Sequence, residues 1–464
     1  GNITVWSDLK TTIAGSLSAR GGKQSGNGGV IETSSARELS FGIELAKVDA
    51  SAPKGQAGVW LIDPQDLTID ATGASNIVSA LNGGTNVTAT TSSCNASCGS
   101  CSGSIGNMTV SSGISWTGTG QLTLTADNNI VLNAGLSATN AASAITLNAG
   151  GTGGISGSSS GTIASAGLVT LNVTNASATG TIAGVISGAG GVTKTGSGTT
   201  TLTAANTYSG TTTVNGGTLN IGSGATGRVG TGAISIGSGA TMMFNTTSYQ
   251  GGTVISSALS GSGIFEVGGS GSTGTIRYSG DASAFSGQVI VDTNARLGLY
   301  SNTSSSTAAD YVINGLLSYQ TSNITFTLGS LAGTGQIGQG GGSSNNILNI
   351  GGNNKSTTFS GNIGNVSDSI QLVKSGSGML ILSGSNTYVS GTTLTGGILQ
   401  IGNGTSGSLA NSGAIVISTG ATLNFNMATG SSFSRPIANS GTISFAQSGT
   451  MAVSSNISGT GSLV

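Results

Sequence analysis

Three cysteines close together are the first candidate for chemistry in this chain. They form the run Cys94-Asn-Ala-Ser-Cys98-Gly-Ser-Cys101, and the chain has no other cysteine and no histidine. A structural zinc ion takes four cysteine or histidine ligands, so a metal site here would lack one ligand. We therefore favour a loop closed by one disulfide in an oxidising compartment, with one thiol left to pair with another chain.

The densest acidic set is Asp63, Asp66 and Asp70, which makes it the candidate for cation binding or acid–base catalysis. Glycoside cleavage needs paired carboxylates, and a calcium-dependent lyase needs a basic group beside its metal, but no base lies near this set in the sequence. The alternative is a turn, because Asp63-Pro64 starts a bend. We favour the turn and predict no catalytic residue, no metal and no cofactor. The chain is therefore predicted not to be an enzyme.

Two other residue types invite a functional interpretation. Trp6, Trp60 and Trp116 could stack on a ligand, but they are few and widely spaced, so we expect them to fill the core or cover an end. Lys194 and Lys374 occupy equivalent positions in a repeat. Equivalence under a repeat favours a structural role for both lysines, such as a charge at a coil corner.

Composition narrows the fold class to a long all-β protein rich in Thr, Ser and Asn. Of 464 residues, 83 are glycine, and only 6% are charged. An average soluble protein has about 7% glycine and about 25% charged residues, which argues against an ordinary helical or α/β domain. The 36% of apolar residues argues against disorder. Collagen is excluded because glycine does not recur at every third position.

Charge is scarce and unevenly distributed. The net charge is −1, which leaves no basic surface for phosphates, so we predict no nucleic-acid partner. No run of about 18 apolar residues is present, so we predict no membrane-spanning helix. Between residues 71 and 193 the only charged residue is Asp127. That stretch must rely on Thr, Ser and Asn side chains rather than on ion pairs for its solubility.

A repeat of 23 to 24 residues runs through the middle of the chain. Its copies are Leu122-Thr-Leu124-Thr-Ala126, Ile145-Thr-Leu147-Asn-Ala149 and Val169-Thr-Leu171-Asn-Val173. Each copy alternates apolar and polar residues, as a half-buried strand does. Clusters of Gly, Asn and Ser separate the copies, as turns require. A unit of this length is too short for a domain and fits one coil of a β-solenoid.

A longer repeat spans 180 residues. Lys194 and Tyr208 recur at that interval as Lys374 and Tyr388, within longer matching segments. The segment that starts at Asn456 resembles the start of a further copy. Because a solenoid without a terminal cap exposes a bare edge, we expect the chain to be a piece of a longer polypeptide.

These patterns predict an elongated, right-handed parallel β-helix, which is a β-solenoid. Strands of successive coils would pair about 4.8 Å apart. Val, Ile and Leu would stack inward, while Thr, Ser and Asn would face outward, and the crossovers would be right-handed. We expect three regions: β-helix coils in 1–70, low-charge coils with the cysteine loop in 71–185, and coils with the 180-residue repeat in 186–464.

Motifs in the first 70 residues follow one another in a recognisable order. They are Gly1-Asn-Ile-Thr-Val5-Trp6, Ala19-Arg20-Gly21-Gly22, Gly26-Asn-Gly28-Gly29-Val30-Ile31-Glu32 and Val59-Trp-Leu-Ile-Asp63-Pro64. This set resembles the large filamentous-haemagglutinin-like exoproteins of Gram-negative bacteria. From about Gly190, the Asn-Thr-Tyr and Gly-Gly-Xaa-Leu units resemble the β-strand repeats of autotransporter passengers.

The resemblance implies an adhesin of the two-partner-secretion type. Such a chain would be a parallel β-helix exported through an outer-membrane pore and displayed at the bacterial cell surface or secreted. Its partners would be other cells or surfaces, the export pore and further copies of itself, with roles in adhesion, biofilm or cell–cell contact. The Cys94–Cys101 run is not part of this pattern, and the family's amino-terminal secretion domain is not evident.

Three functional classes therefore remain. The first is the shaft of a surface adhesin or contact filament, which we favour. The second is a purely structural filament or sheath that assembles with itself. The third is an ice- or crystal-binding solenoid, which needs flat rows of outward threonines. Thr199-Thr-Thr201 and Thr211-Thr-Thr213 are local runs, and the repeat intervals do not place a threonine at every coil. We rank this class last.

Overall fold

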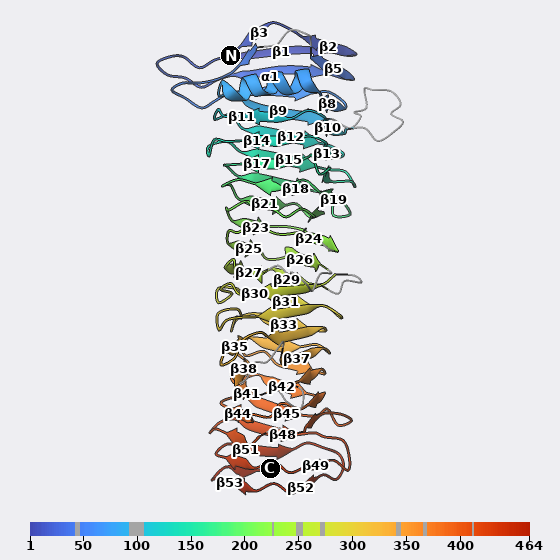
Figure 1. Ribbon diagram of the computed structural model, residues 1–464, viewed down its shortest axis with the longest axis vertical. Helices are drawn as coiled ribbons and strands as arrows, with labels where there is room; N and C mark the ends of the chain where they lie inside the picture. The colour runs from blue at the N-terminus through green and yellow to red at the C-terminus, as the bar shows by residue number, and fades with distance from the viewer. Residues whose placement is uncertain are drawn as a thin grey trace. The chain divides into compact units, whose positions relative to one another are not determined.

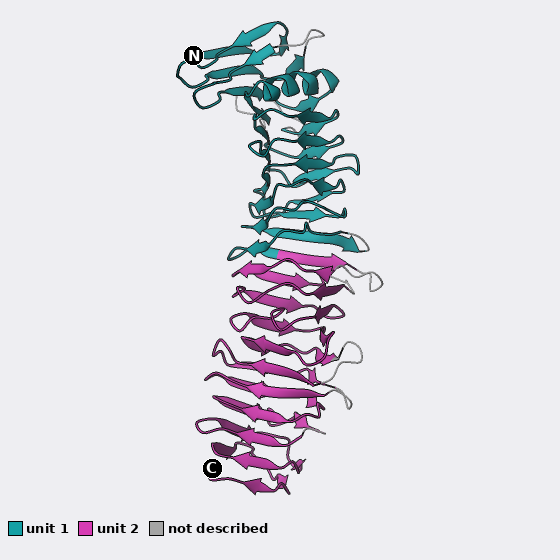
Figure 2. Cartoon of the chain, turned by 60° about the vertical axis from the view of Figure 1, so that its left-hand side comes forward, with its two compact units in different colours: residues 1–241 teal, residues 242–464 magenta. Residues whose placement is uncertain are grey.

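The computed structural model of the chain describes residues 1–41, 47–91, 106–224, 227–246, 254–269, 274–339, 345–364, 369–410 and 413–464. The chain divides into two compact units, Gly1–Thr241 and Met242–Val464 (Figure 2). Within each unit, strands of successive coils pair in parallel and lie one above the next (Figure 1). The predicted parallel β-solenoid is confirmed.

Unit 1 contains three main sheets, of which one, here called the long sheet, runs the length of the unit. In pairing order, the strands of the long sheet are β1 (Asn2–Ser7), β4 (Val30–Ser35), β7 (Val59–Asp63), β9 (Asn86–Thr91), β12 (Leu122–Ala126), β15 (Ile145–Ala149), β18 (Val169–Val173), β21 (Val192–Thr195), β23 (Thr212–Val214) and β25 (Ile234–Ile236).

The other sheets of unit 1 complete the coils. A second sheet contains β8 (Leu67–Ile69), β10 (Met108–Val110), β13 (Ile130–Leu132), β16 (Ile155–Gly157), β19 (Thr179–Ile182), β22 (Thr199–Leu202) and β24 (Thr218–Gly224). A short sheet contains β11 (Ile114–Trp116), β14 (Leu136–Ala138), β17 (Ile163–Ser165) and β20 (Ile186–Ser187). Near the amino terminus, β2 (Lys10–Ile13) pairs with β5 (Glu38–Phe41), and β3 (Ser16–Ser18) pairs with β6 (Lys47–Asp49).

Unit 2 is built in the same way. One sheet, here called the groove sheet, contains β27 (Val254–Ile255), β30 (Thr275–Tyr278), β32 (Arg296–Leu299), β34 (Leu316–Tyr319), β37 (Gln336–Gln339) and β40 (Asn362–Ile363). A second contains β26 (Thr241–Thr246), β29 (Ile264–Val267), β31 (Gln288–Val291), β33 (Asp310–Ile313) and β36 (Ser330–Ala332). A third contains β35 (Thr325–Leu328), β38 (Asn346–Ile350), β41 (Ile370–Lys374), β44 (Thr392–Leu394), β47 (Ile415–Ile417), β50 (Ile437–Asn439) and β53 (Ile457–Ser458).

The remaining strands of unit 2 complete its coils toward the carboxyl terminus. A fourth sheet contains β39 (Thr357–Phe359), β42 (Met379–Leu382), β45 (Ile398–Ile401), β48 (Thr422–Phe425), β51 (Thr442–Phe445) and β54 (Ser462–Leu463). Two short pairs join β43 (Ser385–Asn386) to β46 (Ser408–Leu409) and β49 (Ser432–Phe433) to β52 (Ala452–Val453). The strand β28 (Leu259–Gly261) lies at the start of the unit.

Strand register explains the core of unit 1. Leu124 pairs with Leu147 and Leu147 with Leu171, so identical side chains stack in neighbouring coils, and all three are fully buried. Burying one such side chain contributes about 1.5–3 kcal/mol. The 23- and 24-residue spacing predicted for these coils is confirmed by the same pairing.

The core of unit 2 also contains aromatic rings. The sequence predicts only stacks of Val, Ile and Leu. Phe244 packs on Phe265 at 5.2 Å between ring centroids, and Phe265 packs on Tyr278 at 6.0 Å. Tyr319 and Phe326 stack at 4.9 Å. Such pairs add about 0.5–1.5 kcal/mol beyond the burial of their area, so these rings help to stabilise the core of unit 2.

Among the described residues, one helix interrupts the predicted all-β chain. It is α1 (Ala71–Asn82), between β8 and β9, and it buries Ala74, Ile77 and Leu81 on one face. These positions follow the spacing of an amphipathic helix. Asp70 begins the helix, because its carboxylate accepts a hydrogen bond from the Gly73 amide at 2.8 Å. Within the described residues, the structure has no helix with the length and apolarity needed to cross a bilayer.

The helix cap gives a direct test of this local structure. Asp70→Ala should lower the free energy of unfolding by about 1 kcal/mol, because the Gly73 amide loses its acceptor. Asp70→Asn keeps a side-chain oxygen at the same position and is the matched control. Urea unfolding followed by circular dichroism measures both variants. Equal stability of Asp70→Ala and the parent chain would contradict the capping role.

Candidate functional site

The structure gives each acidic residue of the 63–70 set its own position instead of one shared site. Asp66 accepts a hydrogen bond from the Asn107 amide at 2.7 Å, and Asp70 caps α1. Asp63 ends β7. Among the described residues, no three or more His, Cys, Asp or Glu side chains gather as a metal site would require. Structural roles account for Asp66 and Asp70, and Cys94, Cys98 and Cys101 lie outside the described residues.

The tryptophans divide between the core and the surface. Trp60 is fully buried and donates from Nε1 to Thr33 Oγ1 at 2.8 Å. Trp116 is also buried and donates to the Gly120 carbonyl at 2.9 Å. These two confirm the expected core role. Trp6 differs, because 55% of it is exposed on β1, the strand at which the long sheet begins.

Lys194 is buried and acts at a corner of its coil. Its Nζ donates to the carbonyls of Thr195 at 2.7 Å, Gly196 at 3.0 Å and Gly216 at 3.2 Å. Gly196 has φ 72°, a left-handed conformation that glycine adopts without the steric cost of a β-carbon. The ammonium therefore satisfies carbonyls that the turning chain removes from the sheet ladder.

Lys374 repeats this arrangement in unit 2. Its Nζ donates to the carbonyls of Ser375 at 2.6 Å, Gly376 at 3.1 Å and Gly396 at 3.4 Å, and Gly376 has φ 66°. Burial lowers the pKa of Lys194 and of Lys374 to about 8. Both copies show the structural role at a coil corner that the repeat predicts, and both side chains are buried.

A buried asparagine joins the lysine in each copy. Asn206 accepts from the Ile186 amide at 2.8 Å and donates to the Arg228 carbonyl at 2.7 Å, so it links three successive coils. Asn386 accepts from the Ile363 amide at 3.0 Å and donates to the Ser408 carbonyl at 3.2 Å. The sequence contained the signal, since both residues recur at the 180-residue interval, but the pattern alone did not show what they bind.

A buried tyrosine completes the set of equivalent residues. The hydroxyl of Tyr208 lies 2.8 Å from Thr212 Oγ1, and that of Tyr388 lies 2.8 Å from Thr392 Oγ1. Burial raises the pKa of both phenols, against the opposing effect of the threonine hydrogen bond. The lysine, asparagine and tyrosine of each copy thus form buried hydrogen bonds inside the solenoid.

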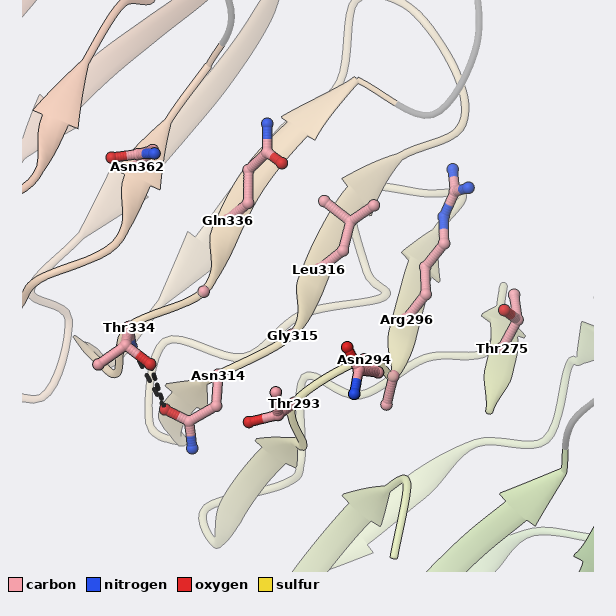
Figure 3. Close-up of a pocket in the computed structure, with 12 residues that line it drawn as sticks. Thr275, Thr293, Asn294, Arg296, Asn314, Gly315, Leu316, Thr334, Gln336 and Asn362 are labelled. Atoms are coloured by element: carbon pink, nitrogen blue, oxygen red, sulfur yellow. Dashed lines mark hydrogen bonds between the residues drawn. The ribbon is translucent and has the colours of Figure 1, made fainter. Parts of the chain in front are cut away.

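An open groove lined by several polar side chains lies on unit 2 and has a volume of about 510 Å³ (Figure 3). Its floor is a row of residues held in register on the groove sheet: Thr275, Arg296, Leu316, Gln336 and Asn362. Asn294, Asn314 and Thr334 border the row, and Asn314 Oδ1 accepts from the Thr334 amide at 3.3 Å.

The chemistry of this groove is that of polar binding. Its described lining contains amides, hydroxyls and one guanidinium, and no Asp, Glu, His or Cys. Arg296 Nε donates to Ser318 Oγ at 3.1 Å, which fixes the guanidinium on the strand. Such a surface can hydrogen-bond a neutral or acidic polar ligand, but it offers no acid–base pair for catalysis. Its residues lie on separate coils, so sequence order did not reveal it.

A carboxyl pair lies elsewhere in unit 2. Burial, followed by the charge of Asp292 and a hydrogen bond to it, raises the pKa of Glu266. Asp292 accepts a hydrogen bond from the Gly269 amide at 2.7 Å. Neither residue lines the groove. Because the two residues are far apart in sequence and meet only through the coil register, sequence reasoning missed this pair.

The outward threonines of the long sheet are arranged differently from what the sequence predicts. Outward threonines do stand at every coil from β9 to β23, in one unbroken row of the long sheet: Thr88, Thr123, Thr146, Thr170, Thr193 and Thr213. The expectation that threonines cluster only locally was wrong. Coil length varies along the row, but the strands pair in register at each step, so uneven sequence intervals give an even row in space.

Comparison with known proteins identifies the repeated coils. The family model of the passenger-associated transport repeat matches residues 192–221 and 372–401. Each matched segment contains the buried lysine and the glycines whose carbonyls it binds. No curated protein and no solved structure matches the chain. The repeat and the β-solenoid fit a passenger secreted by a Gram-negative bacterium.

The two lysines provide matched substitutions in the two copies. Lys194→Met should lower the free energy of unfolding by about 1–3 kcal/mol, because buried carbonyls lose their donor. Lys374→Met should produce a similar loss, since its geometry is the same. The control is Ser137→Ala, an outward side chain on β14, for which a change within about 0.5 kcal/mol is expected. Urea unfolding at pH 7 measures all three variants. A free energy of unfolding that is the same for Lys194→Met as for the parent chain would contradict the structural role of Lys194.

Proposed function

We propose that this chain is the shaft of a secreted, cell-surface adhesin or contact filament that attaches cells to other cells or to surfaces. The observation that carries the proposal is the match of two of its coils to the passenger-associated transport repeat. Support comes from the fold, in which stability accumulates coil by coil and leaves the outer faces free to vary. The groove on unit 2 adds a polar surface of the kind that can bind a receptor.

The proposal includes the route of export and the absence of catalysis. The ordered motifs of residues 1–70 resemble two-partner-secretion exoproteins, whose chains pass through an outer-membrane pore. We propose the same route here, and retain the division into 1–70, 71–185 and 186–464 as regions of different sequence character. Trp60, Lys194 and Lys374 are buried, so we propose no binding or catalytic role for them.

The cysteine run belongs to the same proposal. We propose that one disulfide forms among Cys94, Cys98 and Cys101 after export, because an oxidising compartment favours it. Mass spectrometry of the unreduced protein measures this directly. A mass lower by two hydrogens than that of the fully reduced chain supports the disulfide, and three free thiols would contradict it.

The second candidate is a purely structural filament or sheath. In such a filament, chains would associate laterally or end to end without a ligand. Purified chain that assembles in buffer with no added receptor would favour this candidate. A chain that stays monomeric over a wide concentration range would favour the adhesin.

Adhesion is tested in the producing cells. Deleting the gene should remove thin surface fibres seen by electron microscopy and should lower attachment and cell–cell aggregation. Re-expression of the parent chain should restore both, and protease treatment of intact cells should degrade the chain because it is displayed outside. Unchanged fibres and unchanged attachment in the deletion strain would contradict the proposal.

A further inference from the structure

The long sheet of unit 1 presents two parallel rows of short polar side chains. The first, here called the threonine row, contains Thr88, Thr123, Thr146, Thr170, Thr193 and Thr213. The second, here called the amide row, lies two residues further along each strand and contains Thr90, Thr125, Asn148, Asn172 and Thr195. Buried residues alternate with both rows, so all these side chains face outward.

The two rows form a regular two-dimensional array. Register pairing sets neighbours within a row about 4.8 Å apart, and the two-residue offset sets the rows about 6.6 Å apart. The strands that carry the array, β9, β12, β15, β18, β21 and β23, follow one another down unit 1 (Figure 1).

Hydrogen bonds fix the amide row and leave the threonine row open. Asn172 Nδ2 donates to Asn148 Oδ1 at 3.1 Å, and Asn148 Nδ2 donates to Thr125 Oγ1 at 3.0 Å. In the part of the chain that the structure describes, no hydroxyl of the threonine row has a protein partner. Threonine is also stiff about its first side-chain bond, so its hydroxyl and methyl groups are held in place.

The array carries no charge and no aromatic ring. Between positions 71 and 213 the only charged residues are Asp127 and Lys194, and Lys194 is buried. A ligand for this face is therefore neutral, and it binds through many equivalent weak contacts instead of a few strong ones. Polysaccharide sites commonly stack sugar rings on aromatic faces, which this surface lacks. The cores of protein interfaces are enriched in apolar and aromatic residues, so a second copy of the chain also fits it poorly.

We propose that this face of unit 1 binds ice. Ice is neutral, is periodic in two dimensions, and presents oxygen atoms that hydrogen-bond to hydroxyl groups. Equivalent oxygens on its surfaces recur at intervals close to the spacing of the strands. Fixed hydroxyl and methyl groups at that spacing hold water in positions that match the lattice, so binding adds up over the six coils. This inference is independent of the proposed adhesive role.

Unit 2 provides an internal comparison. The corresponding outward row on its third sheet contains Asn349, Val373, Thr393, Val416 and Ala438. This row mixes amide, apolar and hydroxyl side chains, so it lacks the uniform chemistry of the threonine row. Changes to it should leave ice binding intact, and this makes it the matched control surface.

Thermal hysteresis and partition into growing ice test the proposal on the full chain. The parent chain should enter the ice fraction and hold back crystal growth. Thr123→Lys combined with Thr170→Lys should abolish both effects, because two long charged side chains interrupt the array. Thr393→Lys combined with Ala438→Lys, on unit 2, should retain both.

Folding and competing ligands are controlled in the same experiment. Circular dichroism melting shows whether each variant folds, and Thr123→Gln with Thr170→Gln offers an uncharged second pair if the lysine pair does not fold. A parent chain that is excluded from ice would overturn the proposal. So would equal ice activity of the parent and a folded array variant. Array-dependent binding to crystalline cellulose or chitin, without binding to ice, would also overturn it and would assign a polysaccharide.

Discussion

The in-register pairing of each strand with the next coil is the constraint on which the rest of the structure depends. Once Leu124, Leu147 and Leu171 align, every neighbouring position on their strands aligns as well. Inward positions must then hold side chains that can stack on their own kind, and outward positions become rows. The same hydrogen bonds therefore determine the core, the floor of the groove and the threonine row.

At the corners of the coils, in-register pairing leaves backbone carbonyls without a hydrogen-bond partner in the sheet. A chain that turns takes its carbonyls out of the ladder, and a buried carbonyl without a donor is costly. Lys194 and Lys374 supply that donor at equivalent corners, and Asn206 and Asn386 link the coils above and below. The two segments that match the passenger-associated transport repeat thus share a physical feature, since their buried polar residues hydrogen-bond the backbone from inside the coil.

The secondary structure and role of residues that follow a local periodicity could be predicted from the sequence. Contacts between residues that meet only in space could not. Alternation in Ile145–Ala149 predicts a strand, and the 180-residue recurrence of Lys194 predicts a structural role. The helix α1 was missed although Ala74, Ile77 and Leu81 have helical spacing, because strand periodicity dominates its surroundings. The threonine row and the groove were missed because coil lengths vary, so residues at uneven sequence intervals occupy even positions in space.

The register itself is tested by paired cysteines in a chain whose Cys94, Cys98 and Cys101 are replaced by serine. Residues 146 and 170 pair directly, so their α-carbons lie about 4.8 Å apart, within reach of a disulfide. Residue 172 lies two positions further along and is about 8 Å from residue 146, beyond that reach. Under mild oxidation, Thr146→Cys with Thr170→Cys should cross-link, and Thr146→Cys with Asn172→Cys should not. The reverse pattern, or no cross-link in a folded 146/170 variant, would contradict the solenoid register.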